Sequence, residues 1–175
     1  MNMLTRFFFM KLLLIRELSM QKESQKQLLS QTIKQSYRIL PHDMGWRLHL
    51  PNYRYLSFIE LNISKFLLKV SKTFGCKIHS LVAMQEIVYL KEVKFLDQLS
   101  VETKIEGWDN KYIYFQHTFK VKQQVVSIGL TKVLLVANKQ KCLPADIGLD
   151  DTHITQVVET WQNNQTAIKN QPSSS

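Results

Sequence analysis

The sequence predicts an α+β two-layer domain, in which antiparallel strands pack against one long helix. Residues 53–72 carry apolar side chains at three- and four-residue spacing, which is the period of an amphipathic helix. From residue 80 onward, apolar and polar residues alternate in successive segments with short connections, and strands joined in this way pair antiparallel. A single long helix must then cover one face of the sheet. Because the remaining face or edge also needs cover, we expect a homodimer or a higher homo-oligomer.

Composition places the chain among ordinary globular proteins. Its 175 residues are enough for one domain, and 45 % of them are apolar. Cys76 and Cys142 lie far apart and have no metal-ligand spacing, which is typical of reduced cytoplasmic thiols. These cysteines therefore predict a cytoplasmic location. The sequence has no GxGxxG, P-loop, GxSxG or HExxH motif, and we expect no metal site.

The net charge of +9 is the main oddity of the composition, and it is carried by residues 1–142, because residues 143–175 are net acidic. A basic protein can meet nucleic acid, an anionic membrane or a phosphorylated small molecule. We expect no nucleic acid, since the chain has neither a Lys/Arg run nor a base-reading motif. The other two partners, and a merely solvated basic surface, stay open.

The apolar segment at residues 3–18 (MLTRFFFMKLLLIREL) has apolar residues nearly all round a helical wheel. It does not resemble a cleaved signal peptide, because Lys11 interrupts it and no small-residue cleavage site follows. The uninterrupted part is too short to span a bilayer. The segment could pack against the domain or a partner, or lie on a membrane with Arg6, Lys11 and Arg16 reaching phosphates. A true signal or anchor is the third alternative.

The elements follow in order along the chain. Residues 19–31 form a polar linker or short helix, and residues 32–42 form a first strand with Pro41 near its end. The helix at 53–72 begins after Pro51 and ends before Gly75, which suits a helix stop. Its predicted buried stripe comprises Leu56, Ile59, Ile63, Leu67 and Val70, with Ser57, Ser64, Lys65, Lys69 and Lys72 mostly away from it.

In the second half of the chain, apolar and polar residues alternate with a period of two. The predicted strands are 80–91, 99–106, 111–121 and 125–137. Asp109 and Asn110 form a turn, and His117 shares the apolar face of its strand, most simply as a hydrogen-bonded core or edge histidine. A further helix is predicted within residues 152–171, and residues 172–175 form a disordered tail. We divide the chain into an N-terminal segment (1–31), a domain (32–147) and a C-terminal helix with its tail (148–175).

Polar groups that could perform chemistry are concentrated between Asp43 and Glu60, in the stretch DMGWRLHLPNYRYLSFIE. The start of a helix has unpaired N–H groups and a partial positive charge, so it suits a carbonyl oxygen or an anion. We expect Asp43, His49 and Glu60 to converge there. Glu60 lies at the border of the apolar stripe, so partial desolvation should raise its pKa and make it a base or nucleophile.

Each of these residues also has a structural interpretation. Glu60 could pair with Arg54 or Lys65 at the helix edge, Asp43 could cap a turn, and His49 could serve as a structural hydrogen-bonding group. Asn52 is most simply the N-cap of the helix.

The same stretch resembles the signature of the hotdog-fold thioesterases, in their 4-hydroxybenzoyl-CoA thioesterase and acyl-CoA thioesterase-like branch. The segment LPHDMGWRLHLPNYRYLSFIE keeps the Asp43, His49, Asn52, Tyr55-Leu56 and Glu60 positions. The segment YLKEVKFLDQLSVETKIEGWDNKYIYFQHTF also matches, as do LPADI at 143–147 and the apolar, basic N-terminus. The second acid of the family's acid-x-acid pair falls on Gly45, and the first of its paired asparagines falls on Pro51.

The resemblance implies a hotdog fold, an antiparallel sheet wrapped around one long helix, and an acyl-CoA thioesterase that needs no cofactor beyond the CoA of its substrate. The implied catalytic residues are Asp43, His49 and Glu60. The expected substrate-binding residues are Asn52, Tyr53, Tyr55, Ile59 and Ile63, with an apolar channel for the acyl chain beside the helix. The glycine at position 45 favours the alternative, a non-catalytic hotdog module that binds acyl thioesters or lipids, peripheral to a membrane.

Overall fold

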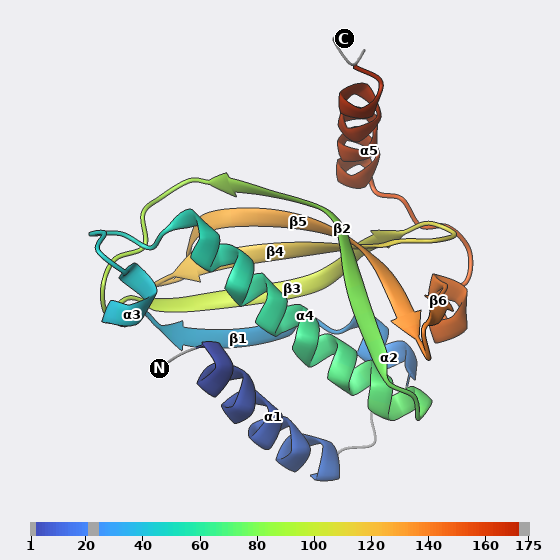
Figure 1. The fold of residues 1–175 in the computed structure, drawn as a ribbon, viewed down its shortest axis with the longest axis horizontal. Coiled ribbons are helices and arrows are strands. Elements are labelled where there is room, and N and C mark those ends of the chain that lie inside the picture. Colours follow the sequence, from blue (N-terminus) through green and yellow to red (C-terminus); the bar gives the residue numbers. More distant parts are fainter. Residues whose placement is uncertain (1–2, 21–24, 172–175) are drawn as a thin grey trace.

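A computed structural model describes residues 3–20 and 25–171 (Figure 1). Its elements in chain order are α1 (Met3–Met20), α2 (Gln25–Ser30), β1 (Ile33–Arg38), α3 (Pro41–Met44), α4 (Asn52–Phe74), β2 (Ile78–Tyr89), β3 (Gln98–Trp108), β4 (Ile113–Val121), β5 (Gln124–Ala137), β6 (Gln140–Cys142), a 3₁₀ turn (Pro144–Ile147) and α5 (Gln156–Lys169). The predicted long helix, the four later strands and the C-terminal helix are confirmed. The predicted tail at 172–175 lies outside the described residues.

The sheet is antiparallel throughout, as predicted, with strand order β1-β3-β4-β5-β2 and β6 paired to β5. The strands that flank α4 in sequence, β1 and β2, lie at opposite edges of the sheet. Figure 1 shows that the sheet curls around α4, which crosses its inner face. This arrangement is a hotdog fold.

Two predicted boundaries near α4 are wrong. The first strand ends at Arg38, because Pro41 starts α3, where a missing N–H costs nothing. The N-cap of α4 is Pro51, with extended backbone at φ −65° and ψ 147°, so Asn52 is the first residue of the helix and not its cap. At the other end, the predicted stop is confirmed, since Gly75 has φ +66° and closes the helix in the left-handed conformation.

The core lies between α4 and the inner face of the sheet. Ile59, Ile63, Leu67 and Val70 are buried, as predicted, whereas Leu56 is 41 % exposed. The helix approaches β5 closely, because a Cβ at Gly129 would lie only 3.2 Å from Ile59 Cδ1.

Lys69, which the stripe places away from the core, is instead buried. Its Nζ donates to Gln31 Oε1 at 3.0 Å. A lysine is rarely buried unless its ammonium group is paired, and Gln31 supplies a partner from the segment between α2 and β1.

A chain of hydrogen bonds crosses this core beneath α4. Asn62 Nδ2 donates to Thr103 Oγ1 at 2.9 Å, and Thr103 Oγ1 lies 2.8 Å from His117 Nδ1. On the other side of the ring, His117 Nε2 lies 3.1 Å from Thr131 Oγ1, which also accepts from Gln85 Nε2 at 3.0 Å. His117 is therefore the hydrogen-bonded core histidine that its strand position suggested, and burial lowers its pKa to about 3.

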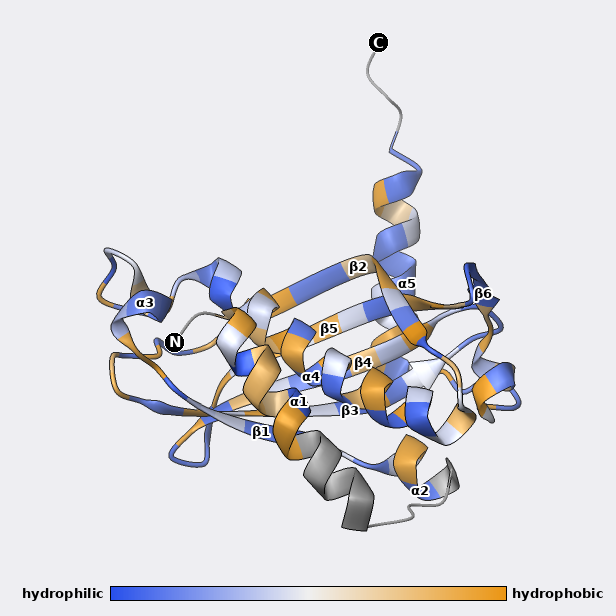
Figure 2. Cartoon of the chain, turned by 60° about the horizontal axis from the view of Figure 1, so that its bottom comes forward, coloured by the Kyte–Doolittle hydropathy of each residue, from blue (hydrophilic) through white to orange (hydrophobic). Residues whose placement is uncertain are grey.

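The helix α1 packs one face on α4 and leaves the other uncovered. Arg6 and Met10 are buried, and Met3 and Phe7 pack against the core. Within the part of α1 whose side chains are described, Leu4, Phe8 and Leu12 are exposed, and Figure 2 shows apolar residues along this helix. Packing against the domain is thus confirmed for one face only. No described helix is both long and apolar enough to cross a membrane, and the side chain of Arg16 lies outside the described part.

The buried histidine predicts how stability depends on pH. An unfolded histidine titrates near pH 6.5 (about the model-peptide value), whereas folded His117 stays neutral down to about pH 3. Between these values the unfolded chain binds a proton that the folded protein does not, so the free energy of unfolding falls as the pH falls, by about 1.4 kcal/mol per pH unit. His117→Gln removes this contribution. Urea unfolding between pH 6 and 4 should show a shallower acid slope for the variant; parallel slopes would contradict the assignment.

Candidate active site

A groove of about 420 Å³ with a mixed apolar and polar lining runs between α4 and the edge strand β2. From α4 it is lined by Ile59, Glu60 and Ile63, and from β2 by His79, Val82 and Gln85. The groove lies beside the helix, where an acyl channel is predicted, and Glu60 is the one carboxylate among the described residues that line it. It can hold an apolar chain with a carboxylate at its side.

Asp43 lies elsewhere, in the interior. Its side chain has no exposed surface, and Oδ2 accepts from Arg6 Nη2 at 2.7 Å and from the backbone N–H of Leu40 at 3.0 Å. Arg54 Nε lies 3.7 Å from Oδ1. Asp43 thus caps the start of α3, the capping role given above as its structural alternative. While Arg6 covers the carboxylate, Asp43 cannot contact a substrate.

Arg6 is held by two aromatic rings and a backbone hydrogen bond in addition to its ion pair with Asp43. Its guanidinium Cζ lies 5.6 Å from the ring centroid of Tyr37 and 5.3 Å from that of Phe58, and Nη2 also donates to the carbonyl oxygen of Arg38 at 3.0 Å. A planar guanidinium suits both aromatic faces and a carboxylate. The pair Arg6–Asp43 therefore fixes α1 to the segment that leads into α4.

The start of α4 has its own set of polar groups. His49 pairs in a β-bridge with Lys94, and its Nδ1 lies 3.9 Å from Glu92 Oε1. Asn52 is exposed in the first turn of the helix, and its carbonyl oxygen accepts from the Tyr89 hydroxyl at 3.4 Å. The Arg54 N–H donates to the carbonyl oxygen of Pro51 at 2.9 Å, and the N–H groups before it are those that a helix start leaves without a partner in the helix, so this end suits a carbonyl oxygen.

The two tyrosines of this segment have different environments. Tyr53 is 57 % exposed and can contact a ligand, whereas Tyr55 is only 2 % exposed and packs edge-on against Tyr89 and Phe119. Burial, with Tyr89 and Glu92 nearby, raises the pKa of Tyr55 to about 12. Tyr55 is therefore a neutral core residue at physiological pH.

The predicted catalytic residues do not converge. Asp43 is interior and His49 lies beside Glu92. Glu60 is exposed in the groove, so the predicted partial desolvation is not seen. No hydrogen bond or ion pair joins any two of the three in the part of the chain that the structure describes. Asn52 and Glu60 are eight residues apart, which is about 12 Å along the helix axis.

Two functional candidates were missed by sequence reasoning. Glu92 follows β2 and reaches His49, and Gln85 lines the groove from β2 while its amide is held by Thr131. The alternation of β2 could have placed Gln85 on the helix-facing side of the sheet. No local pattern indicates the contact of Glu92.

Gly45, where the family pattern has an acid, adopts φ +61°. This is a backbone conformation that L side chains rarely take. The local backbone is therefore suited to glycine, and an acidic side chain here would be strained.

The comparisons with known proteins agree with this architecture. Residues 39–162 match the thioesterase-like superfamily, and because the match spans most of the chain, the chain belongs to that family. A probable thioesterase of Saccharomyces cerevisiae is 25 % identical over 112 residues, which are 61 % of this chain and 49 % of the relative. The chain thus spans about half the length of that curated relative.

Solved structures show the same fold at low identity. A hypothetical protein of Staphylococcus aureus in complex with CoA is 13 % identical, with a TM-score of 0.55 over 84 % of this chain and 90 % of that one. A variant of 4-hydroxybenzoyl CoA thioesterase complexed with 4-hydroxybenzoyl CoA is 16 % identical, with a TM-score of 0.58 over 66 % and 95 %. The predicted membership of the hotdog thioesterases is confirmed.

The Arg6–Asp43 pair predicts a large loss of stability when it is broken. Arg6→Ala removes the cation that hydrogen-bonds the buried carboxylate and leaves only the longer, 3.7 Å contact with Arg54, which costs about 3 kcal/mol. Arg47→Ala is the matched control, because Arg47 is exposed and its loss should cost about 0.5 kcal/mol or less. Urea unfolding compares the two variants. Equal midpoints would show that the pair does not hold the structure together.

Proposed function

We propose that this protein is an acyl-CoA thioesterase that hydrolyses an acyl thioester to the free acid and CoA. The observation that carries the proposal is the groove beside α4, apolar along Ile59 and Ile63 and flanked by the carboxylate of Glu60. Family membership supports a thioester substrate. The CoA ligands of two structurally similar proteins, together with the basic charge of this chain, support CoA as the leaving group.

In the proposed mechanism the acyl chain lies in the groove, and Glu60 acts on the thioester as a general base for water or as a nucleophile. N–H groups at the start of α4 would stabilise the oxyanion, with His49 and Asn52 positioning substrate or water. About 12 Å of helix separates Asn52 from Glu60. The N–H groups at the start of α4 and the Glu60 carboxylate of one protomer therefore cannot both reach the same thioester carbonyl. A second copy that brings its own α4 alongside would complete the site.

A homodimer through β2 would supply that second copy. This strand is a sheet edge with twelve residues, and it exposes apolar side chains, with Leu81 58 % and Val88 52 % exposed. Long apolar edge strands pair readily with another chain. Antiparallel pairing of two β2 strands would place the two α4 helices side by side in opposite directions.

The dimer is tested by adding charge to this edge. We expect Leu81→Lys/Val88→Lys to shift the protein toward a monomer in size-exclusion chromatography with light scattering, because the lysines would have to be desolvated and would repel one another at the interface. The matched control is Val157→Lys/Ile168→Lys on α5, where both residues are 52 % exposed. A monomeric wild type, or equal masses for both variants, would exclude this interface.

Activity is tested by free-thiol release from short, long and aromatic acyl-CoAs. We expect Glu60→Gln to lower the rate about 10²-fold or more, the range for loss of a general base. His49→Ala should lower it as well. Asp43→Asn should act on stability first, because Asp43 is interior, and Glu159→Gln on α5 is an exposed control. Full rate in Glu60→Gln would refute its role even if the wild type is active.

The second candidate is a non-catalytic module that binds acyl thioesters or lipids. The glycine conformation at position 45 favours it, because the second acid of the family pattern is absent there. A wild type that releases no more thiol than buffer, yet binds acyl-CoA in calorimetry, would establish this alternative.

A further inference from the structure

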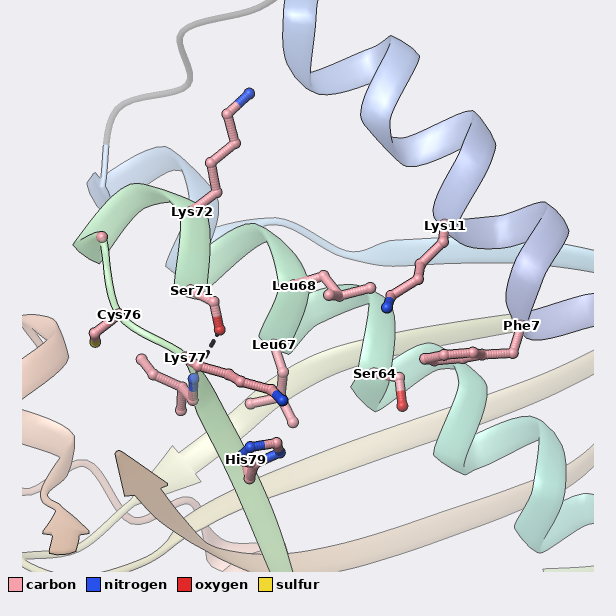
Figure 3. Close-up of a pocket in the computed structure, with 12 residues that line it drawn as sticks. Phe7, Lys11, Ser64, Leu67, Leu68, Ser71, Lys72, Cys76, Lys77 and His79 are labelled. Carbon is pink, nitrogen blue, oxygen red and sulfur yellow. Dashed lines mark hydrogen bonds between the residues drawn. The ribbon is translucent and has the colours of Figure 1, made fainter. Parts of the chain in front are cut away.

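A second groove adjoins the first and has a different character. It has a volume of about 530 Å³ and lies between α1, the C-terminal half of α4 and the start of β2 (Figure 3). Phe7, Leu67 and Leu68 provide an apolar lining. Its charged groups are all basic, since no acidic side chain is found among the described residues that line it.

Lysines from two parts of the chain line this groove. Figure 3 shows Lys11 from α1 reaching toward Leu68 and Lys77, just before β2, reaching toward His79, whereas Lys72 points away from the groove. Lys11 Nζ lies 5.3 Å from the ring centroid of Phe7, so this cation sits against the apolar lining. Cations beside apolar surface suit an anion that carries a hydrocarbon part.

The outer face of α1 continues the apolar surface next to this groove. Leu4, Phe8 and Leu12 recur every four residues and are 68 %, 71 % and 67 % exposed. Phe9 and Leu13, at 60 % each, widen the stripe. A helix with an exposed apolar face, flanked by lysine and too short in its apolar run to span, is suited to lie in the interface plane of a bilayer.

We propose that α1 and this groove form a docking site for an anionic phospholipid surface. The apolar stripe of α1 lies among the acyl chains, and Lys11 and Lys77 bind a lipid phosphate at the groove. Charge complementarity selects this occupant, because the charged groups among the described residues that line the groove are all basic and a lipid phosphate supplies the opposite charge. The proposal goes beyond the thioesterase activity and does not depend on it.

The test is co-sedimentation of the full chain with phosphatidylcholine vesicles, with and without phosphatidic acid. Lys11→Gln/Lys77→Gln should weaken binding to the acidic vesicles about 10-fold or more, since each lysine near an anionic surface contributes about 1 kcal/mol. The matched control is Lys139→Gln/Lys141→Gln, which removes the same charge from two exposed lysines, one in the β5–β6 turn and one in β6. Equal losses in the two variants, or equal wild-type binding to both kinds of vesicle, would overturn the proposal.

The apolar face is tested separately. Phe8→Gln/Leu12→Gln leaves Arg6 and the lysines in place and should abolish most vesicle binding. If this variant binds as well as the wild type, the groove takes a free anion and the lipid-surface proposal fails.

A further test uses the wild type alone. Its binding to acidic vesicles should fall as salt rises, and a salt-independent affinity would also overturn the proposal.

Discussion

Burial of α4 against the inner face of the sheet is the constraint on which the rest of the structure depends. Phe58 and Val70 have no exposed surface, and the approach at Gly129 leaves no room for a larger residue without displacing Ile59. Polar groups that a closely packed helix buries generally need hydrogen-bond partners. Asn62 donates hydrogen bonds to Thr103 and to the backbone carbonyl oxygen of Val101. Directional hydrogen bonds therefore fix the position of the helix, in addition to the burial of its apolar side chains.

The periodic parts of the fold could be predicted from the sequence, because burial on one face imposes a period on any element long enough to show it. The helix at 53–72 and four strands emerged in this way. The helix α3 and the strand β6, of four and three residues, are too short to show a period. The burial of Lys69 could not be predicted either, because its hydrogen-bonding partner, Gln31, is brought to it only by the tertiary fold.

The candidate site was harder to predict because nearness along the chain is a poor guide to nearness in space. Residues on one helix are held apart by its rise, which separates Glu60 from the loop of His49. Asp43 meets its partner Arg6 across 37 residues, and no local pattern indicates such a contact. The apolar residues of the groove were found, since Ile59 and Ile63 belong to the periodic stripe, but the contribution of β2 required the sheet order.

The Arg6–Asp43 pair has a consequence for communication between distant parts of the molecule. It joins α1 to the segment that leads into α4, through a contact with almost no exposed surface. If a ligand bound at α1 or at the start of α4 changes this contact, thermodynamic reciprocity requires that each ligand changes the affinity for the other by the same factor. A ligand that steadies α1 would then tighten binding at the start of α4, and a substrate there would strengthen whatever holds α1. Under that condition, the buried pair is the physical link between α1 and the start of α4.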